Sequence, residues 1–382
     1  MRVLITGGGT GGHVNPALAI ADTIKRNDPD SVIEYVGTSR GIENKLVPKA
    51  GYKVHHIEIR GIRRSLSPEN IKTAYYALTS PMKAKKLIRE FKPDIVIGTG
   101  GYVCWPVVKA ASEMQIPTAL HESNAVPGVA VRMLAGKVDR IWLNFEKTGE
   151  TLHEKEKLLH VGNPLRTQFA ELSKKQALEK LGLDGKYEYV LLSYGGSLGA
   201  EKVNEMMLKV MNEVVSKHPE IYHVHATGAS SYEKVRAQFE SLGLDKCDNI
   251  RLAEYIYDMP VYMAASDLTV CRAGAMTVSE IAAAGKCALF IPSPNVTNNH
   301  QFKNASVLAD AGAALVYEEN GIDQSDIVSK ISHLLSKAGD GERAAMEKAV
   351  KAFAVKDANR LIYEDICKMV AESKKIVNRK LR

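Results

Sequence analysis

The feature that most constrains the fold of this chain is a glycine-rich stretch near its N-terminus. Val3-Leu4-Ile5-Thr6 reads as a short apolar strand, and Gly7-Gly8-Gly9-Thr10-Gly11-Gly12-His13 follows it directly. A helix is expected next, from about residue 16 to residue 24. Glycine at this density serves a backbone that turns sharply and comes close to another group. The N-terminus of a helix offers N–H groups and the positive end of a dipole, so the stretch predicts a strand–loop–helix unit suited to a phosphate.

Three interpretations of this loop are open at this point. Gly7-x-Gly9-x-x-Gly12 satisfies the dinucleotide-binding fingerprint, and Glu34 lies about 20 residues further on, where such folds carry the acid that binds the ribose. The same glycines also suit another phosphate, or a tight turn that binds nothing. Other motifs in the sequence are needed to decide between these interpretations.

Strand-like and helix-like runs alternate along the whole chain, which predicts an α/β protein with parallel sheets. Strands are expected at 3–6, 32–36, 55–59, 94–98, 118–121, 140–143, 189–193, 222–226, 250–252, 268–271, 288–291 and 314–317. A second glycine loop, Gly195-Gly196-Ser197-Leu198-Gly199-Ala200, echoes the first. Since 382 residues exceed one ordinary domain, we expect two, divided near Val161-Gly162-Asn163-Pro164, with amphipathic helices from about residue 345 to the end.

The composition is that of a soluble globular protein, with 45% hydrophobic and 25% charged residues. The first strand begins directly after Met1, so no signal peptide is expected, and no apolar run is long enough to span a bilayer. The five cysteines form neither a Cys-x-x-Cys pair nor a zinc spacing, which favours reduced thiols.

The net charge of +7 is concentrated in the first half of the chain. Residues 1–163 hold 23 basic and 16 acidic residues, whereas residues 164–382 hold 28 of each. Residues 53–92 alone hold 10 basic and 3 acidic residues. A local basic field indicates an anionic partner, and the sequence contains no nucleic-acid-binding module, so a membrane surface or a phosphorylated substrate is favoured over nucleic acid.

The basic segment is expected to form a helix that begins at Ser67-Pro68 and is interrupted at Pro81. Two interpretations of it stay open. It is either a surface helix whose apolar face packs on its own sheet, or an interfacial patch in which apolar side chains enter a membrane surface among basic ones. The apolar residues are Ile71, Ala74, Tyr75, Leu78, Met82, Leu87, Ile88 and Phe91, and the basic ones are Arg60, Arg63, Arg64, Lys83, Lys85 and Lys86.

Three further stretches place polar or glycine residues just after expected strands, where open parallel sheets bind ligands. Gly98-Thr99-Gly100-Gly101-Tyr102 is another candidate phosphate loop. His121-Glu122-Ser123-Asn124 ends a buried strand, and the Asn124 amide suits recognition of a sugar, although such residues more often only hold loops. Arg272-Ala273-Gly274-Ala275-Met276-Thr277 opens a helix suited to a diphosphate, with Glu280 placed to bind a ribose.

Rival motifs are weaker. Gly195-x-Ser197-x-Gly199 matches a nucleophile elbow, with Asp258 or Asp267 and then His300 in hydrolase order, but that reading leaves the first half unexplained. Asp28-Pro29-Asp30 has the carboxylate spacing of a metal–diphosphate site, yet it precedes the second strand and is expected to be a turn. No lysine follows a glycine loop as a nucleoside triphosphatase requires.

Taken together, these motifs resemble the MurG-type N-acetylglucosaminyltransferases of bacterial cell-wall synthesis. The resemblance spans essentially the whole chain and adds Gly162-Asn163-Pro164-Leu165-Arg166 and His300-Gln301-x-x-Asn304-Ala305 to the stretches above. Two departures stand out, because Leu198 replaces a usual Gln and Cys104-Trp105 replaces a common Ser-Gly pair. Both concern local contacts rather than the reaction.

The resemblance implies a GT-B fold, with two Rossmann-like, doubly wound parallel-sheet domains facing across a cleft. Residues 1–162 would form an acceptor and membrane-facing domain, residues 163–351 a UDP-GlcNAc-binding domain, and a C-terminal helix from about 352 to 382 would pack back on the first. The implied reaction is inverting transfer of GlcNAc from UDP-GlcNAc to the 4-hydroxyl of undecaprenyl-diphospho-N-acetylmuramyl-pentapeptide, which converts lipid I to lipid II in peptidoglycan synthesis. A related transferase with a diacylglycerol-type acceptor is the alternative, and a nucleotide-sugar sensor or a Rossmann oxidoreductase remain further possibilities.

The resemblance also implies which residues bind and react. Ile256 would meet uracil through its backbone, Glu280 the ribose, and Ser197 with the start of the 275–277 helix the diphosphate. The full set of implied substrate-binding residues is Thr10, Gly11, Gly12, Asn124, Arg166, Ser197, Ile256, Ala275, Met276, Thr277, Val278, Ser279, Glu280 and Gln301. His13 is the expected general base, since an imidazole of near-neutral pKa suits that task. No metal and no cofactor are expected, and the protein is expected to lie peripherally on the cytoplasmic face of the cell membrane, against anionic lipid.

Overall fold

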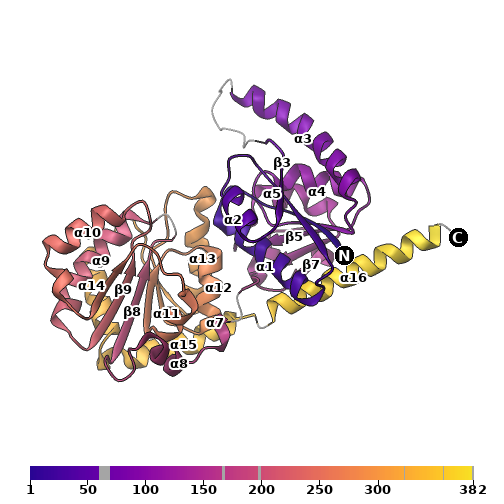
Figure 1. Cartoon of the computed structure of the whole chain (residues 1–382). Coiled ribbons are helices and arrows are strands. Elements are labelled where there is room, and N and C mark those ends of the chain that lie inside the picture. The colour runs from indigo at the N-terminus through magenta and orange to yellow at the C-terminus, as the bar shows by residue number, and fades with distance from the viewer. Residues whose placement is uncertain (60–68, 166–167, 197–198, 322, 356, 381–382) are drawn as a thin grey trace. The chain divides into compact units, whose positions relative to one another are not determined.

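The chain folds into two compact units. The computed structural model describes residues 1–59, 69–165, 168–196, 199–321, 323–355 and 357–380. Unit 1 contains Met1–Leu165 and Val355–Arg382, and unit 2 contains Arg166–Ala354 (Figure 1). The sequence placed these two boundaries three residues earlier, after 162 and after 351. The expected helix start at Ser67-Pro68 and the basic residues Arg60, Arg63 and Arg64 lie outside the described residues.

Unit 1 is built on a seven-stranded parallel sheet with the strand order β3-β2-β1-β4-β5-β6-β7. Its strands are β1 (Arg2–Thr6), β2 (Val32–Gly37), β3 (Lys53–His56), β4 (Ile95–Gly98), β5 (Thr118–Glu122), β6 (Arg140–Leu143) and β7 (Leu158–His160). Its helices are α1 (Gly11–Asn27), α2 (Glu43–Lys49), α3 (Glu69–Phe91), α4 (Cys104–Glu113), α5 (Val129–Leu134), α6 (Glu146–Gly149) and α16 (Ala358–Lys380), with the 3-10 helices η1 (Ala135–Lys137) and η2 (Lys155–Lys157).

Both faces of this sheet are covered by helices, as the alternation of side chains along its strands requires. Val3 and Ile5 of β1 belong to a buried cluster with α1 and α16, whereas Leu4 belongs to one with α3, α4 and α5. The C-terminal helix α16 therefore completes the core of the unit in which the chain begins. The indole N–H of Trp142 on β6 donates to Asp365 of α16 at 2.7 Å.

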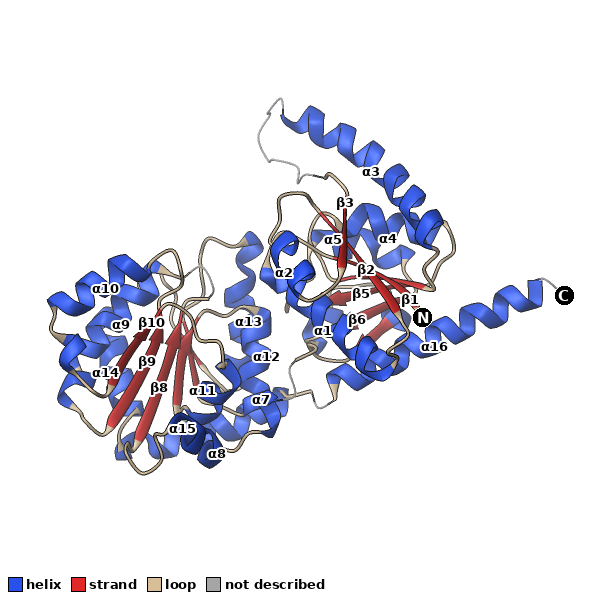
Figure 2. Ribbon diagram, viewed as in Figure 1, coloured by secondary structure: helices blue, strands red, loops and turns tan. Residues whose placement is uncertain are grey.

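Unit 2 is built on a six-stranded parallel sheet with the strand order β10-β9-β8-β11-β12-β13 (Figure 2). Its strands are β8 (Tyr189–Tyr194), β9 (Ile221–Ala226), β10 (Ile250–Ala253), β11 (Leu268–Cys271), β12 (Ala288–Phe290) and β13 (Leu315–Val316). Its helices are α7 (Gln168–Glu171), α8 (Lys174–Leu181), α9 (Glu201–Glu213), α10 (Tyr232–Ser241), α11 (Met259–Ala265), α12 (Ala275–Ala284), α13 (His300–Ala309), α14 (Gln324–Leu334) and α15 (Asp340–Val350), with the 3-10 helices η3 (Val215–Lys217), η4 (Leu244–Lys246), η5 (Thr297–Asn299), η6 (Lys337–Gly339) and η7 (Lys351–Phe353).

The two strand orders place the expected ligand loops at corresponding points. In each sheet the order reverses beside its first strand: β1 pairs with β2 on one side and β4 on the other, and β8 pairs with β9 and β11 in the same way. Ligands of open parallel sheets bind at such a switch point, beyond the carboxyl ends of the strands. The loops after β1 and β4 meet at one switch point, and those after β8 and β11 at the other.

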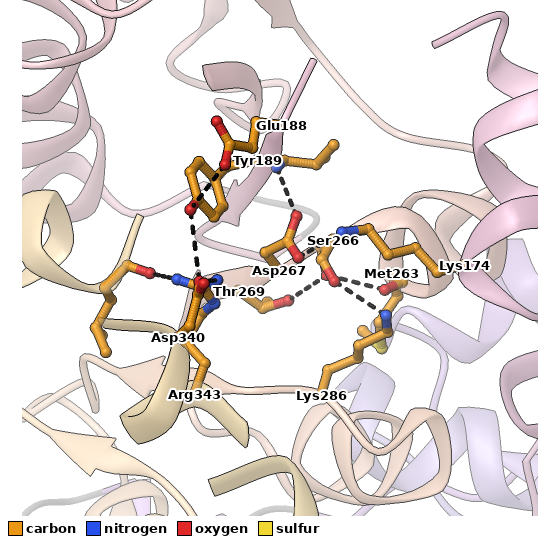
Figure 3. A network of polar contacts seen from close by, with 12 residues as sticks. Lys174, Glu188, Tyr189, Met263, Ser266, Asp267, Thr269, Lys286, Asp340 and Arg343 are labelled. Carbon is orange, nitrogen blue, oxygen red and sulfur yellow. Dashed lines mark hydrogen bonds and ion pairs between the residues drawn. The ribbon is translucent and has the colours of Figure 1, made fainter. Parts of the chain in front are cut away.

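A polar network holds the opposite, amino-terminal edge of the sheet in unit 2 (Figure 3). The Asp267 carboxylate, just before β11, accepts from the Val190 N–H of β8 at 2.8 Å and pairs with Lys174 of α8. The buried Lys286 ammonium donates to the Ser266 carbonyl oxygen at 3.0 Å, and burial lowers its pKa. Asp267 is therefore a structural residue at the edge away from the loop after β8, which contradicts its use in a nucleophile-elbow triad.

Four local expectations were wrong in detail. Helix α1 begins at Gly11 rather than near residue 16, β3 covers Lys53–His56 rather than 55–59, β7 was not expected, and α3 runs through Pro81 without ending. Glu34 lies in the middle of β2 and is bonded to His55 at 2.5 Å and Lys53 at 3.3 Å, so it does not stand where a dinucleotide ribose would need it. Within the described residues, no helix is both long and apolar enough to cross a bilayer.

Candidate active site

The loop after β1 in unit 1 is held closely against the loop after β4. The Gly8 N–H donates to the Gly100 carbonyl oxygen at 3.2 Å, and the Tyr35 hydroxyl of β2 donates to the Gly7 carbonyl oxygen at 2.9 Å. Gly101 has a φ of +81°, and a Cβ added there would collide with the Gly8 carbonyl oxygen. Glycine is therefore required at Gly101 for both conformation and space.

His13 stands at the junction of these two loops. It is the third residue of α1, is half-buried, and has Nδ1 3.0 Å from the Gly8 carbonyl oxygen. Because a carbonyl oxygen can only accept, Nδ1 carries the proton and the lone pair lies on Nε2. The ring packs against Gly100, and the Thr99 hydroxyl donates to the His13 carbonyl oxygen at 2.8 Å. Burial lowers the pKa of His13, although the bond to Gly8 and the Glu43 carboxylate raise it.

Thr10, Gly11 and Gly12 form the start of α1 beside His13. Thr10 is the N-cap residue in an extended conformation, and its side chain makes no capping bond. Thr10 and Gly12 are exposed, whereas Gly11 is half-buried. The first N–H groups of a helix have no carbonyl in a preceding turn, so Gly11 and Gly12 direct N–H groups and a positive dipole end toward an anion. The structure thus brings four predicted site residues, Thr10 to His13, together with the loop of Thr99 to Gly101.

Glu43 is a residue of this region that the sequence analysis did not identify. It is the first residue of α2 and is fully buried, yet its carboxylate accepts from the Gly9 N–H at 3.1 Å. Nothing in the stretch Gly41-Ile42-Glu43 resembles a known motif, and a glutamate at a helix start reads as an ordinary surface residue. Its contact with the glycine loop depends on tertiary structure.

The polar side chains at the end of β5 and just after it mostly form hydrogen bonds that fix the neighbouring loops. The His121 ring is buried, lies 3.0 Å from the Gly162 carbonyl oxygen through Nε2, and has its pKa lowered to about 4 by burial. The Glu122 carboxylate accepts from the N–H groups of Asn124 at 2.9 Å and Gly128 at 2.7 Å. The Asn124 amide nitrogen also donates to Glu122, at 3.1 Å. Asn124, the predicted substrate-binding residue, is therefore fixed in place by its neighbour.

In unit 2, α12 begins directly after β11 at the switch point. Gly274 is its extended N-cap, and the first turn contains Ala275, Met276 and Thr277. Ala275 and Val278 are buried, while the other four predicted residues from Met276 to Glu280 are half-buried. The Arg272 guanidinium, just before this turn, donates to the Ile291 carbonyl oxygen at 2.9 Å and pairs with Glu319. The helix thus presents an N-terminus lined by small side chains, which suits a diphosphate.

The remaining predicted donor residues are Ile256, Gln301, Ser197 and Arg166, of which the structure describes the first two. Ile256 is 5% exposed and lies in the segment between β10 and α11, so its predicted backbone contact with uracil stays a prediction. The Gln301 amide oxygen, on the first turn of α13, accepts from the Ser293 N–H at 2.8 Å. Ser197 and Arg166 lie outside the described residues, as does Leu198. Among the described residues, no three His, Cys, Asp or Glu side chains gather as a metal ion would require.

Comparison with known proteins agrees with this arrangement. Residues 3–143 match the model of the glycosyltransferase family 28 N-terminal domain, and residues 190–362 match that of the glycosyltransferase family 28 C-terminal domain. The two units are therefore the N- and C-terminal domains of a glycosyltransferase with the GT-B fold.

Similar proteins identify the family of glycosyltransferases to which the chain belongs. The chain is 40% identical over 369 residues to a UDP-N-acetylglucosamine–N-acetylmuramyl-(pentapeptide) pyrophosphoryl-undecaprenol N-acetylglucosamine transferase of Acetivibrio thermocellus, covering 96% of this chain and 97% of that one. A protein of the same name from Caldanaerobacter subterraneus is 40% identical over 366 residues, covering 95% and 98%. The crystal structure of Acinetobacter baumannii MurG superposes with a TM-score of 0.75 at 27% identity, covering 96% and 99%. The chain belongs to glycosyltransferase family 28 and, within it, to the family of these N-acetylglucosamine transferases.

Proposed function

We propose that this protein transfers GlcNAc from UDP-GlcNAc to the 4-hydroxyl of undecaprenyl-diphospho-N-acetylmuramyl-pentapeptide, converting lipid I to lipid II in peptidoglycan synthesis. The names of the 40%-identical relatives support this reaction. The structural observation that carries it is the presence of two separate phosphate-suited loops, one at the switch point of each sheet. A transferase that joins a nucleotide diphosphate sugar to a lipid diphosphate needs two such loops, whereas a dinucleotide oxidoreductase needs one.

The two units divide the substrates between them in this proposal. The donor belongs to unit 2, where the N–H groups at the start of α12 meet its diphosphate, the Ile256 backbone meets uracil, and Glu280 meets the ribose. Ser197, Arg166 and Gln301 of unit 2 complete the donor site, and Asn124 of unit 1 is a further predicted substrate-binding residue. The acceptor belongs to unit 1, with its diphosphate at Thr10, Gly11 and Gly12.

The chemistry is a single displacement at the anomeric carbon of GlcNAc. The acceptor O4 forms a bond to C1 while the bond from C1 to the diphosphate oxygen breaks, so UDP leaves with the electron pair and the linkage inverts from α to β. His13 Nε2 takes the hydroxyl proton, because Nδ1 is committed to the Gly8 carbonyl oxygen and the lowered pKa keeps the ring neutral near pH 7. The N–H groups and dipole of α12 stabilise the charge that grows on the leaving diphosphate.

The substrate assignment is tested by a panel of donors and acceptors. The protein is mixed with UDP-GlcNAc, UDP-glucose or UDP-GalNAc and either a short-chain muramyl-pentapeptide diphospholipid or diacylglycerol. We expect disaccharide only from UDP-GlcNAc with the muramyl acceptor. Release of UDP only with diacylglycerol would establish the alternative acceptor instead.

The assignment of the base is tested with His13→Ala. General-base catalysis contributes about 10²- to 10⁴-fold, so kcat is expected to fall by at least about 100-fold while the Kd of UDP-GlcNAc stays unchanged. A variant that keeps kcat but shows a raised KM for the acceptor would mean that His13 only orients the acceptor.

We further propose that α3 binds an anionic membrane surface at the cytoplasmic face of the cell membrane. Tyr75, Leu78 and Met82 are 63%, 75% and 62% exposed, and their spacing places them on one helix face. Lys83, Lys85 and Lys86 follow on the same helix, although Lys85 is paired with Glu113 and Lys86 with Glu90. By contrast, Ile88 and Phe91 are buried in the sheet core, so the C-terminal part of α3 is an ordinary packing helix.

Co-sedimentation with vesicles tests this surface. The double variant Leu78→Gln/Met82→Gln is expected to lose about 10-fold or more of its binding to phosphatidylglycerol vesicles, because two apolar side chains no longer enter the interface. Leu242→Gln is the control, since Leu242 is 46% exposed on unit 2. Equal binding of both variants would refute the assignment.

A further inference from the structure

One peptide group lies between two titratable side chains at the switch point of unit 1. The carbonyl oxygen of the Gly8–Gly9 peptide is 3.0 Å from His13 Nδ1, and the N–H of that same peptide donates to Glu43 Oε2 at 3.1 Å. From this geometry we infer that Glu43 is a positioning residue for His13, acting through the Gly8–Gly9 peptide as a carboxylate–peptide–imidazole relay. The inference rests on the proposed function, in which His13 is the general base.

The Glu43 carboxylate is held firmly enough for this task. Its Oε1 accepts from the Thr38 N–H at 2.9 Å and from the Thr38 hydroxyl at 2.8 Å, so with Gly9 the carboxylate has three donors. Burial raises the pKa of Glu43, but hydrogen bonds from Thr38, from its own N–H and from Gly9 outweigh burial and keep the pKa below its ordinary value. The side chain is therefore a buried anion at neutral pH, and none of the ion pairs between described residues includes it.

The backbone around the carboxylate is shaped to admit it. A Cβ on Gly8 would lie 2.6 Å from Glu43 Oε1, and a Cβ on Gly37 would lie 2.5 Å from its Cγ. A Cβ on Gly41 would collide with the carboxylate itself. Gly8 in the loop after β1, and Gly37 and Gly41 just before Glu43, thus leave the space that the carboxylate fills, which fixes it against the loop.

The relay has two consequences for His13. Hydrogen bonds that share one peptide group polarise one another, so the Glu43 charge makes the Gly8 carbonyl oxygen a stronger acceptor and holds the proton on Nδ1. It also stabilises the imidazolium that forms when Nε2 takes the proton of the acceptor hydroxyl. In that step Nδ1 and the Gly9 nitrogen keep their protons, and Glu43 stays ionised.

Other titratable groups near the loop do not compete with Glu43. Tyr35 on β2 bonds to the Gly7 carbonyl oxygen, and burial raises its pKa. Cys104 on α4 is buried, and burial raises the pKa of its thiol to about 12. Both groups are neutral near pH 7, so the Glu43 charge is the one that acts on His13 in this described part of the chain.

The Glu43 contact also changes how the glycine loop meets the acceptor. The Gly9 N–H is used by Glu43 and the Gly8 N–H by the Gly100 carbonyl oxygen, so neither is directed at a substrate. The acceptor diphosphate is then left with the N–H groups of Gly11 and Gly12, which lie in the same first turn of α1 as His13.

The first test leaves Glu43 unchanged and uses a variant only to assign signals. Nuclear magnetic resonance of the isotope-labelled protein follows the His13 ring nitrogens, assigned by their loss in His13→Gln, and the Gly9 amide proton across a pH titration. We expect Nδ1 to stay protonated and the Gly9 amide shift to move with the same midpoint as His13. The Gly51 amide, which donates to Pro48 in a remote turn, is the control. A Gly9 shift that stays constant while His13 titrates would overturn the relay.

The second test compares Glu43→Gln with Thr38→Val. Loss of the charge is expected to lower the pKa of His13 by about half a unit to one unit. The acid limb of the kcat profile then moves to lower pH, and kcat on its plateau falls by about 10- to 100-fold. Thr38→Val removes one donor to Oε1 but leaves the charge and the Gly9 bond, so its thermal midpoint should fall without a shift of that limb. If the acid limb of the pH profile of kcat lies at the same pH in both variants, the relay is refuted.

These outcomes separate the relay from the proposed function. If His13→Ala retains kcat, the base assignment fails, although the coupled titration of Gly9 and His13 still decides whether the relay exists. If His13→Ala abolishes turnover while Glu43→Gln changes neither the His13 titration nor kcat, the base stands and the relay is wrong. An unchanged Kd for UDP-GlcNAc in Glu43→Gln shows that the donor unit is folded.

Discussion

A buried carboxylate, Asp365, contributes to the attachment of α16 to unit 1. It is 8% exposed, accepts from the Trp142 indole N–H at 2.7 Å and pairs with Arg140 Nε at 3.0 Å. We predict that Asp365→Ala loosens α16 while Asp365→Asn, which keeps an acceptor for the indole, loosens it less. Apart from these bonds, α16 is held by apolar packing on α1, by the Asn359 amide that donates to the Leu165 carbonyl oxygen at 2.7 Å, and by the ion pair of Lys374 with Asp94 at 3.3 Å.

The magnitude follows from the groups left behind. Asp365→Ala leaves a fully buried indole N–H without an acceptor, which costs about 1–3 kcal/mol. It also removes the ion pair with Arg140, and because Arg140 is 22% exposed, this loss costs about 1 kcal/mol. The sum is about 2–4 kcal/mol for Asp365→Ala and about 1 kcal/mol for Asp365→Asn. At 1.4 kcal/mol per factor of ten, amide exchange in α16 should quicken by about 30- to 700-fold and about 5-fold respectively.

Hydrogen exchange read by mass spectrometry over residues 358–380 measures this opening directly, without assuming that the two units unfold together. Glu364→Gln is the matched control, because it removes the neighbouring exposed ion pair with Arg360, worth at most about 0.5 kcal/mol. Exchange that quickens equally in Asp365→Ala and Glu364→Gln would show that the buried bonds do not anchor the helix.

Three further predictions concern the site and the core. Turnover should stay within about twofold in excess EDTA, because the α12 N–H groups supply the charge stabilisation, and strict loss of activity would contradict this. Gly101→Ala should lower kcat by about 10-fold or more through the collision with Gly8, whereas Gly185→Ala, at a similar positive φ with open space around it, should leave kcat unchanged. Burial lowers the pKa of His225 to about 4, so between about pH 6.5 and pH 4 the unfolded chain binds a proton at this residue that the folded unit 2 does not. The free energy of unfolding of unit 2 should therefore fall by about 1.4 kcal/mol per pH unit below about pH 6.5 and be unaffected by this group above it. Urea midpoints between pH 7 and pH 4.5 check this, and a slope that is the same in His225→Gln would refute it.

The sequence was sufficient for the two-unit α/β architecture because parallel strands buried on both faces leave continuous apolar runs. Val3-Leu4-Ile5 and Val190-Leu191-Leu192 are such runs, and each ends at a glycine loop that the structure places at a switch point. The exposed edge strand β7 was missed because Leu158-Leu159-His160 is short and follows a run of Lys and Glu.

Helix boundaries depended on forces that a local pattern does not contain. Glycine has a low helix propensity, so Gly11 and Gly12 read as loop, yet they form the first turn of α1. Pro81 reads as a helix break, but the Ser80 hydroxyl bonds to the Tyr76 and Glu58 carbonyl oxygens and α3 continues. Packing of α1 and α3 on the sheet outweighs these local preferences.

Residues of the candidate site could be predicted from the sequence only where they lie together in one short stretch. Thr10 to His13 and Ala275 to Glu280 each come shortly after a strand, so their sequence context was enough to predict their place at a switch point, while their roles stay predictions. Glu43 reaches Gly9 across 34 positions of the chain, and Gly8, which makes room for it, is about equally distant in sequence. Such a contact leaves no local pattern, because each residue alone reads as a turn or a surface helix.

The return of α16 to unit 1 has a consequence for the order of folding during synthesis. Unit 2 is one uninterrupted segment, Arg166–Ala354, and can close its core as soon as that segment has emerged. Unit 1 begins the chain but lacks Ile362 and Ile366 against α1 until the final residues are made. The half that is translated first is therefore completed last, and its open apolar face is what a chaperone would meet on the nascent chain.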